Sequence, residues 1–266
     1  MNKTVAHSAE KIVDQEYWDT QYKNNRTGWD LGCVSPPIQS YIDQLPNKEL
    51  AILIPGCGNT YEAEHLLKIG FTNITVIDIA PTLVQKLEEK FQDNPNITIV
   101  LGDFFEHEGK YDLIIEQTFF CALPPKLRQR YVWKMHSLLT SNGILTGLLF
   151  DKEFESGPPF GGTKAEYQML FQHAFEFIVF EHAKNSIKPR AGSELEIRFK
   201  KNNAVFVQLY SPKIEKELDV EGIKTNLLKQ NKILNVSISI DQASILVVSS
   251  TSIDDFDLDT IANSPK

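Results

Sequence analysis

The segment between residues 51 and 78 constrains the fold of this chain more than any other. It begins with the apolar run AILI, which is long enough for a buried strand, and continues into a turn with the sequence PGCGN. Apolar residues then recur at helical spacing, and a second apolar run, ITVI, ends at Asp78. Strand, glycine-containing turn, helix, strand and acidic residue are, in this order, typical of a nucleotide-binding βαβ unit.

The glycine turn indicates which kind of nucleotide would bind. Gly56 and Gly58 allow the backbone to approach a ligand without a Cβ in the way, and Asp78 follows at the spacing typical of a carboxylate that binds ribose hydroxyls. A dinucleotide-binding turn has a third glycine where this chain has Tyr61. The pattern therefore favours a nucleoside without a pyrophosphate, such as S-adenosylmethionine. The alternative is a tight turn in which Asp78 only caps a loop.

Composition narrows the class of protein further. The 266 residues carry a formal net charge of −8 without a long basic block, so neither nucleic acid nor an anionic membrane is an expected partner. The N-terminal segment is polar, and no apolar run approaches the ~20 residues that span a bilayer, which predicts a soluble, cytoplasmic protein. Cys33, Cys57 and Cys121 are widely spaced, which predicts reduced thiols and neither a disulfide framework nor a zinc site.

The chain up to about residue 200 alternates between strands and helices. After the βαβ unit, strands are expected at 97–101, 111–116, 144–150, 175–180 and 194–199. Helices are expected at 81–91, 127–139 and 164–171, and Asn142-Gly143 should end the second of these. These elements predict an α/β fold with a seven-stranded, Rossmann-like sheet.

Two further groups of residues stand out, at a strand end and near the N-terminus. Asp103 and Phe104 directly follow a strand, and ligands of open α/β sheets bind beyond the carboxyl ends of the strands. We therefore expect both to face the same crevice as the glycine turn, where the aspartate could hydrogen-bond an adenine amino group and the phenylalanine could cover its ring. The alternative is an Asx turn followed by a phenylalanine of the core. Near the N-terminus, Trp18 and Tyr22 share one helix face and Trp29 lies in a glycine-flanked loop. Two tryptophans so close to glycines are unusual, and one interpretation is a hydrophobic lid that only packs on the core.

The residues from 203 onward differ in character. Strands are expected at 204–209, 233–240 and 244–248, and helices at 220–228 and 257–262. The order β-α-β-β-α predicts a small α+β ferredoxin-like module over 203–266, separate from a domain over 1–202. Its sheet would have one apolar face that needs a cover, formed by Val205, Val207, Ile238, Ile240 and Leu246. This tail contains no cysteine, so we expect no soft-metal site, and an exposed edge strand would suit self-association or a protein partner.

A set of motifs connects the chain to a known family. In order, they are GWDLG, IPGCGNTYE, VIDIAPT, GDFF, YDLIIEQTFFCALPPKLRQRY, GPPF and PRAGSE. In this combination the chain resembles the thiopurine S-methyltransferase superfamily, in particular its branch of halide/thiol methyltransferases. The resemblance implies a class I methyltransferase with S-adenosyl-L-methionine as cofactor. Because all of these motifs precede residue 200, the tail should not be needed for methyl transfer.

The resemblance also implies which residues form the site. The expected cofactor-binding residues are Trp18, Tyr22, Trp29, Gly56, Cys57, Gly58, Asp78, Ile79, Asp103, Phe104, Glu116 and Gln117. The expected substrate-binding residues are Trp29, Phe120, Arg128 and Phe160. No catalytic base and no metal ligand are implied. Three departures from the family concern four positions: Tyr22 replaces a tryptophan, Glu116-Gln117 replaces Asp-Tyr, and Phe160 replaces a tyrosine. These departures concern the acceptor more than the cofactor.

The implied reaction is methyl transfer to a small soft nucleophile, such as a thiol, hydrosulfide, thiocyanate or a halide. A halide, thiocyanate or hydrosulfide is already anionic near neutral pH, so proximity and desolvation suffice without a strong base. A larger thiol would gain from stabilisation of its thiolate by Arg128. One alternative is a class I methyltransferase that acts on an oxygen or nitrogen of a small metabolite. Another is a non-catalytic protein that senses S-adenosylmethionine and binds a partner through its tail.

Overall fold

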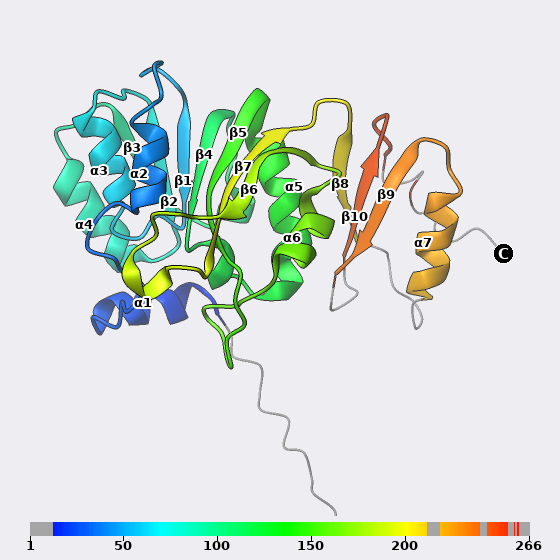
Figure 1. Ribbon diagram of the computed structural model, residues 1–266, viewed down its shortest axis with the longest axis horizontal. Coiled ribbons are helices and arrows are strands. Elements are labelled where there is room, and N and C mark those ends of the chain that lie inside the picture. Colours follow the sequence, from blue (N-terminus) through cyan, green and yellow to red (C-terminus); the bar gives the residue numbers. More distant parts are fainter. Residues whose placement is uncertain (1–12, 212–218, 240–243, 255–257, 259, 261–266) are drawn as a thin grey trace, which may run out of the picture.

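The computed structural model describes residues 13–211, 219–239, 244–254, 258 and 260. The strands among these residues form two sheets (Figure 1). The larger sheet has the order β3-β2-β1-β4-β5-β7-β6, and the smaller has the order β8-β10-β9. The strands of the larger sheet are β1 (Ile52–Pro55), β2 (Ile74–Asp78), β3 (Ile97–Leu101), β4 (Tyr111–Gln117), β5 (Leu139–Phe150), β6 (Phe175–His182) and β7 (Glu194–Lys201).

The strand order fixes where a ligand can bind. Strands β1 to β5 pair in parallel, and β7 runs antiparallel between β5 and β6. The chain proceeds outward from β1 through β2 to β3 and then returns to β4 on the other side of β1. This reversal creates a topological switch point between β1 and β4, and a crevice opens there at the carboxyl ends of the strands. The predicted seven-stranded Rossmann-like sheet is therefore confirmed.

Helices cover both faces of the larger sheet. Their bounds are α1 (Gln15–Lys23), α2 (Pro36–Ile42), α3 (Tyr61–Lys68), α4 (Pro81–Phe91), α5 (Arg128–Leu138) and α6 (Lys164–Phe171). Apolar residues of α2, α3 and α4 form one buried cluster with the sheet, and those of α5 and α6 form another on the opposite face. Short 3-10 helices lie at η1 (Phe104–Glu106), η2 (Phe120–Ala122), η3 (Pro125–Leu127) and η4 (Lys188–Arg190). No helix of the described residues is long and apolar enough to cross a bilayer.

One predicted boundary is wrong. Asn142-Gly143 does not end a helix, because α5 stops at Leu138 and β5 begins at the next residue. Gly143 instead lies inside the strand, where an added Cβ would come within 3.0 Å of the Tyr111 carbonyl oxygen on β4. A glycine inside a strand commonly marks such a close approach of two backbones. The Asn-Gly pair was therefore misread as a helix end.

The smaller sheet confirms the predicted order of the tail as far as the chain is described. It contains β8 (Phe206–Tyr210), β9 (Ile233–Ile238) and β10 (Ile245–Ser249), all antiparallel to their neighbours, with α7 (Val220–Leu228) between β8 and β9 in sequence. Residue Ile240, the turn at 241–243 and most of the helix predicted at 257–262 lie outside the described residues.

The prediction of a single apolar face in the tail is wrong. Val205, Val207, Leu246 and Val248 belong to the same buried cluster as α5, whereas the neighbouring Ile245 and Val247 pack with α7 on the other face. Ile238, which was assigned to the first face, packs with the second cluster. Figure 1 shows α5 between the two sheets. The tail therefore forms a further layer on α5.

Candidate active site

A cavity of about 760 Å³ opens at the carboxyl ends of the parallel strands. It lies between these strand ends and the N-terminal segment that contains α1. Among the residues expected to bind the cofactor, the structure brings together Trp18, Tyr22, Trp29, Gly56, Cys57, Gly58, Asp78, Ile79, Asp103, Phe104 and Gln117 along its wall. Glu116 is the exception, because it does not line the cavity.

The Asp78 carboxylate holds the glycine turn after β1 through a hydrogen bond. Gly56 and Gly58 have φ angles of +54° and +53°, which glycine adopts without strain. The Asp78 carboxylate accepts hydrogen bonds from the Gly58 N–H at 3.1 Å and the Ala80 N–H at 3.0 Å. Burial raises the pKa of Asp78, and these N–H donors oppose the rise. A carboxylate has about four acceptor sites, so Asp78 retains capacity for a ligand hydroxyl.

The expected adenine-side residues meet the glycine turn through one aromatic ring. Asp103 accepts a hydrogen bond from the Phe105 N–H at 2.8 Å and so caps the start of η1. The first residue of η1, Phe104, is buried. The rings of Phe104 and Phe119 lie edge to face at 5.1 Å. A Cβ added to Gly56 would come within 2.2 Å of the Phe119 ring, so only glycine fits opposite it.

The N-terminal aromatics Trp18, Tyr22 and Trp29 line the cavity as one packed group. Trp29 packs edge to face against Trp18 at 5.4 Å and Tyr22 at 5.9 Å. Helix α1 is fixed to α4, because Asp19 accepts a hydrogen bond from the Thr82 N–H at 2.7 Å. The predicted hydrophobic lid thus forms one wall of the cavity.

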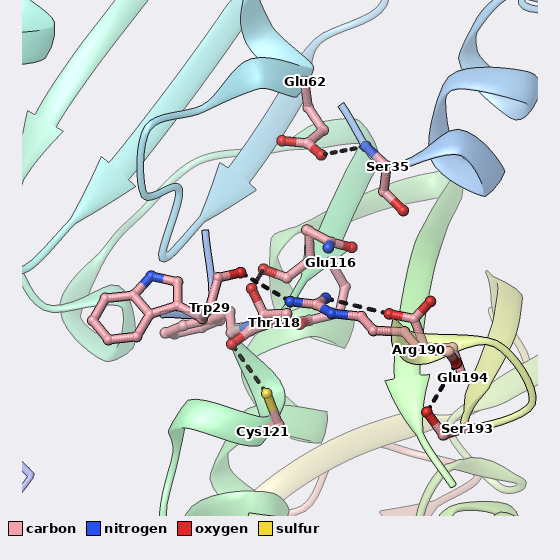
Figure 2. A network of polar contacts seen from close by, with 11 residues as sticks. Trp29, Ser35, Glu62, Glu116, Thr118, Cys121, Arg190, Ser193 and Glu194 are labelled. Atoms are coloured by element: carbon pink, nitrogen blue, oxygen red, sulfur yellow. Dashed lines mark hydrogen bonds and ion pairs between the residues drawn. The ribbon is translucent and has the colours of Figure 1, made fainter. Parts of the chain in front are cut away.

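Arg190 also holds the lid, and no role had been predicted for it. Its guanidinium donates to the Trp29 carbonyl oxygen at 2.9 Å and to Glu194 Oε1 at 3.3 Å (Figure 2). The Glu194 side chain is only 3% exposed, so this ion pair is well shielded from water. A second anchor is Asp30, which accepts hydrogen bonds from Asn59 and from the Tyr61 hydroxyl. The motifs GWDLG and PRAGSE, which contain Asp30 and Arg190, were the available signal.

Three expected substrate-binding residues do not line the cavity. Arg128 donates to the Gly161 carbonyl oxygen and lies over the rings of Phe120 at 5.1 Å and Tyr167 at 5.7 Å. It therefore supports the loop at 157–162 from behind, and Phe120 is buried beneath it. The backbone N–H of Phe160 donates to the Cys121 carbonyl oxygen at 2.6 Å, and the preceding prolines reach the cavity instead.

The part of the cavity away from the glycine turn is mainly apolar. Its wall includes Cys121, Leu123, Leu127, Phe150, Phe154, Pro158 and Pro159. Two cations also line the cavity there, Lys152 beside the Phe154 ring and Arg190 beside the Phe150 ring. Burial raises the pKa of the Cys121 and Cys57 thiols, so both remain protonated at neutral pH. None of the residues that line this cavity is a histidine. The arrangement suits a reaction that depends on exclusion of water more than on a base.

Comparisons with known proteins agree with this geometry. The family model described as thiopurine S-methyltransferase matches residues 13–206. The chain is 33% identical over 195 residues to Probable thiol methyltransferase 2 of Arabidopsis thaliana, covering 70% of this chain and 85% of the relative. It is 27% identical over 206 residues to Thiocyanate methyltransferase 1 of Brassica oleracea, covering 75% and 91%. It is also 27% identical to Thiopurine S-methyltransferase of Acinetobacter baylyi over 187 residues, covering 62% and 86%.

Solved structures support the fold. The 1,6-didemethyltoxoflavin-N1-methyltransferase of Burkholderia thailandensis, crystallised with S-adenosylhomocysteine, superposes with a TM-score of 0.58 at 18% identity over 74% of this chain and 93% of its own. Magnesium protoporphyrin IX methyltransferase of Synechocystis, with bound S-adenosylmethionine, gives 0.55 at 17% identity over 73% and 100%.

The sheet order, the glycine turn and the acidic residue after β2 define a class I S-adenosylmethionine-dependent methyltransferase. The residues present fit this cofactor, because Gly56 and Gly58 keep two positions of the turn free of Cβ atoms, Asp78 offers a carboxylate and aromatic rings line the space. Within this class, the chain belongs to the thiopurine S-methyltransferase family.

Proposed function

We propose that this enzyme transfers the methyl group of S-adenosylmethionine to the sulfur of a small thiol, and that hydrosulfide, thiocyanate and halides react in the same way. The observation that supports this proposal is the single cavity, in which a nucleoside-binding turn meets an apolar, aromatic wall without a histidine. Relatives named for thiol, thiocyanate and thiopurine methylation agree with it.

The residues that line the cavity divide into two roles. Asp78 binds the ribose, Asp103 and Phe104 bind the adenine, and the turn around Gly56 and Gly58 binds the methionine part of the cofactor. The lid aromatics Trp18, Tyr22 and Trp29, with Cys57, Ile79 and Gln117, complete the cofactor side. The acceptor lies against Trp29 and the apolar wall. Arg128, Phe120 and Phe160 support that wall from outside, and so affect the acceptor indirectly.

The mechanism follows from the exclusion of water by this wall. When bound, S-adenosylmethionine supplies an electrophilic methyl group attached to a sulfonium. The lid aromatics line the same cavity, and aromatic rings tolerate a cationic sulfur better than aliphatic groups do. The apolar wall removes water from an incoming anionic nucleophile, which increases its reactivity, and the lid keeps the reacting groups together. A methyl transfer to oxygen or nitrogen would generally need a base. Histidine is the most common such base, and the cavity lining contains none.

The decisive experiment is a product assay on the purified enzyme with S-adenosylmethionine and a panel of acceptors. The panel contains aromatic and aliphatic thiols, hydrosulfide, thiocyanate and iodide, together with phenol and aniline analogues of the same thiols. We expect methylated products from the sulfur nucleophiles and none from their oxygen and nitrogen analogues. Transfer to the phenol or aniline at equal or higher rates would contradict the proposal, and binding without any transfer would favour a sensor.

The proposed site of action is the cytoplasm. Cys33, Cys57 and Cys121 are free thiols in the structure, as suits a reducing compartment. Self-association or binding of a protein partner through the tail is part of the same proposal, supported by β8 and β9, which are the outer strands of the small sheet among the described residues.

A further inference from the structure

A buried carboxyl group lies directly behind the cavity wall, at the end of β4. Glu116 is fully buried and accepts hydrogen bonds on one oxygen, Oε1, from the N–H groups of Phe119 at 2.8 Å and Phe120 at 2.9 Å. Its other oxygen, Oε2, lies 2.6 Å from the Tyr131 hydroxyl of α5. Figure 2 shows this group beside the lid contacts of Arg190. Burial of a carboxyl group costs free energy, so the position of Glu116 in the protein interior needs an explanation.

The segment that Glu116 holds forms part of the cavity. Gln117, Thr118, Phe119 and Cys121 all line it. Thr118 has a φ angle of +59°, which is rare for a β-branched residue and persists only where surrounding contacts enforce it. The next two residues, Phe119 and Phe120, donate their N–H groups to Glu116. These two hydrogen bonds close the turn that begins at the strained Thr118.

This segment touches each part of the cofactor side. The Phe119 ring fills the space opposite Gly56 and packs against Phe104, so it contacts both the glycine turn and the adenine-side residue. The carbonyl oxygen of Cys121 accepts the hydrogen bond from the Phe160 N–H, which connects the segment to the proline loop. A shift of the segment would therefore alter the wall on several sides at once.

We propose that Glu116 is a positioning residue, whose carboxyl group sets the path of residues 117–121 and thereby shapes the cofactor site through Phe119. It does not line the cavity, so it acts on the ligand only through this segment. The inference rests on the S-adenosylmethionine site alone and is independent of which acceptor is methylated.

The hydrogen-bond pattern predicts which substitutions are tolerated. In Glu116→Gln, the amide oxygen can still accept from the N–H groups of Phe119 and Phe120, and the amide NH₂ can donate to the Tyr131 oxygen. In Glu116→Leu, the side chain keeps a similar volume but leaves both N–H groups buried without an acceptor. A positioning role therefore requires that glutamine rescue what leucine loses.

The test is calorimetric binding of S-adenosylhomocysteine to the full chain. We expect Glu116→Leu to weaken binding at least about tenfold and Glu116→Gln to stay within about threefold of the wild type. Asp112 provides the matched control, because it lies at the other end of β4 and accepts hydrogen bonds from the Ala51 N–H and the Thr140 hydroxyl, both at 3.0 Å. Asp112→Leu should lower the melting temperature and leave the affinity within about twofold.

Two results would overturn the proposal. Unchanged affinity in Glu116→Leu would show that the segment keeps its path without the carboxyl group. Equal losses in the leucine and glutamine variants would show that the negative charge itself acts on the ligand.

A milder variant decides the matter if Glu116→Leu does not fold. Tyr131→Phe removes only the hydroxyl that fixes Oε2, and we expect faster amide exchange at Phe119 and Phe120 with about two- to fivefold weaker binding. Unchanged exchange and affinity would overturn the proposal. Because only binding is measured, a failure of methyl transfer to every acceptor would contradict the proposed function and leave this result intact.

Discussion

Asp78 accepts hydrogen bonds from the Gly58 and Ala80 N–H groups, so its carboxylate shapes the turn as well as facing the cavity. Glu116 performs a related task on β4, two strands away in the sheet, where it holds the N–H groups of Phe119 and Phe120. In both cases a buried carboxyl group at a strand end orders the backbone that follows. The two residues differ in that only Asp78 reaches the cavity.

Replacement of Asp78 should weaken cofactor binding. We expect Asp78→Ala to reduce affinity for S-adenosylhomocysteine by roughly 1–3 kcal/mol, because ribose hydroxyls and the Gly58 N–H lose their acceptor. Asp78→Asn, which retains one acceptor oxygen, should lose less. Calorimetry measures both, and equal affinities for alanine variant and wild type would contradict the assignment of Asp78 to the ribose.

Ionisation of Glu116 should make stability depend on pH. Burial raises its pKa from 4.5 to about 7, against the hydrogen bonds from Tyr131, Phe120 and Phe119. A carboxyl group with a raised pKa in the folded state stabilises the fold fully below pH 4.5, and this contribution disappears as the pH rises through about 7. This shift in pKa between the unfolded and the folded state corresponds to about 3 kcal/mol of the free energy of unfolding at most.

The measurement is the free energy of unfolding of the wild type and of Glu116→Gln between pH 5 and pH 8. We expect the wild type to lose stability relative to the glutamine variant as the pH rises, because glutamine cannot ionise. The comparison cancels other titrating groups, including His136, whose pKa is lowered by burial to about 4. A difference that stays constant over this range would contradict the raised pKa.

At the scale of elements, the lid is a preassembled unit. Trp29 packs on both aromatics of α1, and Arg190 connects its backbone to the start of β7. The lid therefore depends on the ring contacts of Trp29 within the N-terminal segment and on polar contacts that join Trp29 and Asp30 to distant parts of the chain. Each can be removed separately.

Removal of the Trp29 side chain should affect turnover more than stability. We expect Trp29→Ala to reduce kcat/KM by about 10- to 100-fold with a small fall in melting temperature, because the ring closes the reacting groups off from water. Trp133→Ala is the control, since this tryptophan lies in α5 and not on the cavity wall. It should lower the melting temperature and preserve turnover of the folded enzyme. A collapse of stability in Trp29→Ala would assign the residue to core packing.

Arg190 should be replaceable neither by alanine nor by lysine. A lysine ammonium keeps the charge, but it lacks the planar fork that bridges the Trp29 carbonyl and Glu194. We expect Arg190→Lys to raise the KM for the cofactor by about three- to tenfold and to speed amide exchange at residues 27–34. Normal exchange in that segment would show that Arg190 does not hold the lid.

The accuracy of sequence prediction followed the kind of physical signal available. The helices 81–91 and 164–171 were predicted to the residue, because a proline or a threonine-glutamate capping box marks their starts. The direction of a side chain at a strand end has no such signal, so Glu116 was placed in the cavity although it points behind it. The position of Arg128 was likewise unpredictable, since its partners Gly161 and Tyr167 are distant in sequence.

At the scale of the whole molecule, the tail and the methyltransferase domain share a buried cluster. Val207, Leu246 and Val248 pack in the same core as Tyr131 and Met135 of α5. The division into 1–202 and 203–266 describes the sequence motifs, and it stays a prediction for the folded chain. The shared core leads us to expect that the tail stabilises α5, which carries the Tyr131 hydroxyl bonded to Glu116.

This packing predicts that the two parts unfold together. Val248→Asp places a carboxylate in the interface with α5, where Val248 is 1% exposed, and should cost roughly 3–5 kcal/mol. Because the interface belongs to the core of α5, calorimetry should show one transition at a lower temperature for the whole chain, with weaker binding of S-adenosylhomocysteine. Leu234→Asp is the matched control, since Leu234 is 49% exposed on the same small sheet and the change should alter stability by no more than about 0.5 kcal/mol. If Val248→Asp instead separates a low-temperature transition from an unchanged one that still responds to S-adenosylhomocysteine, then the tail folds independently and the cofactor site does not need it.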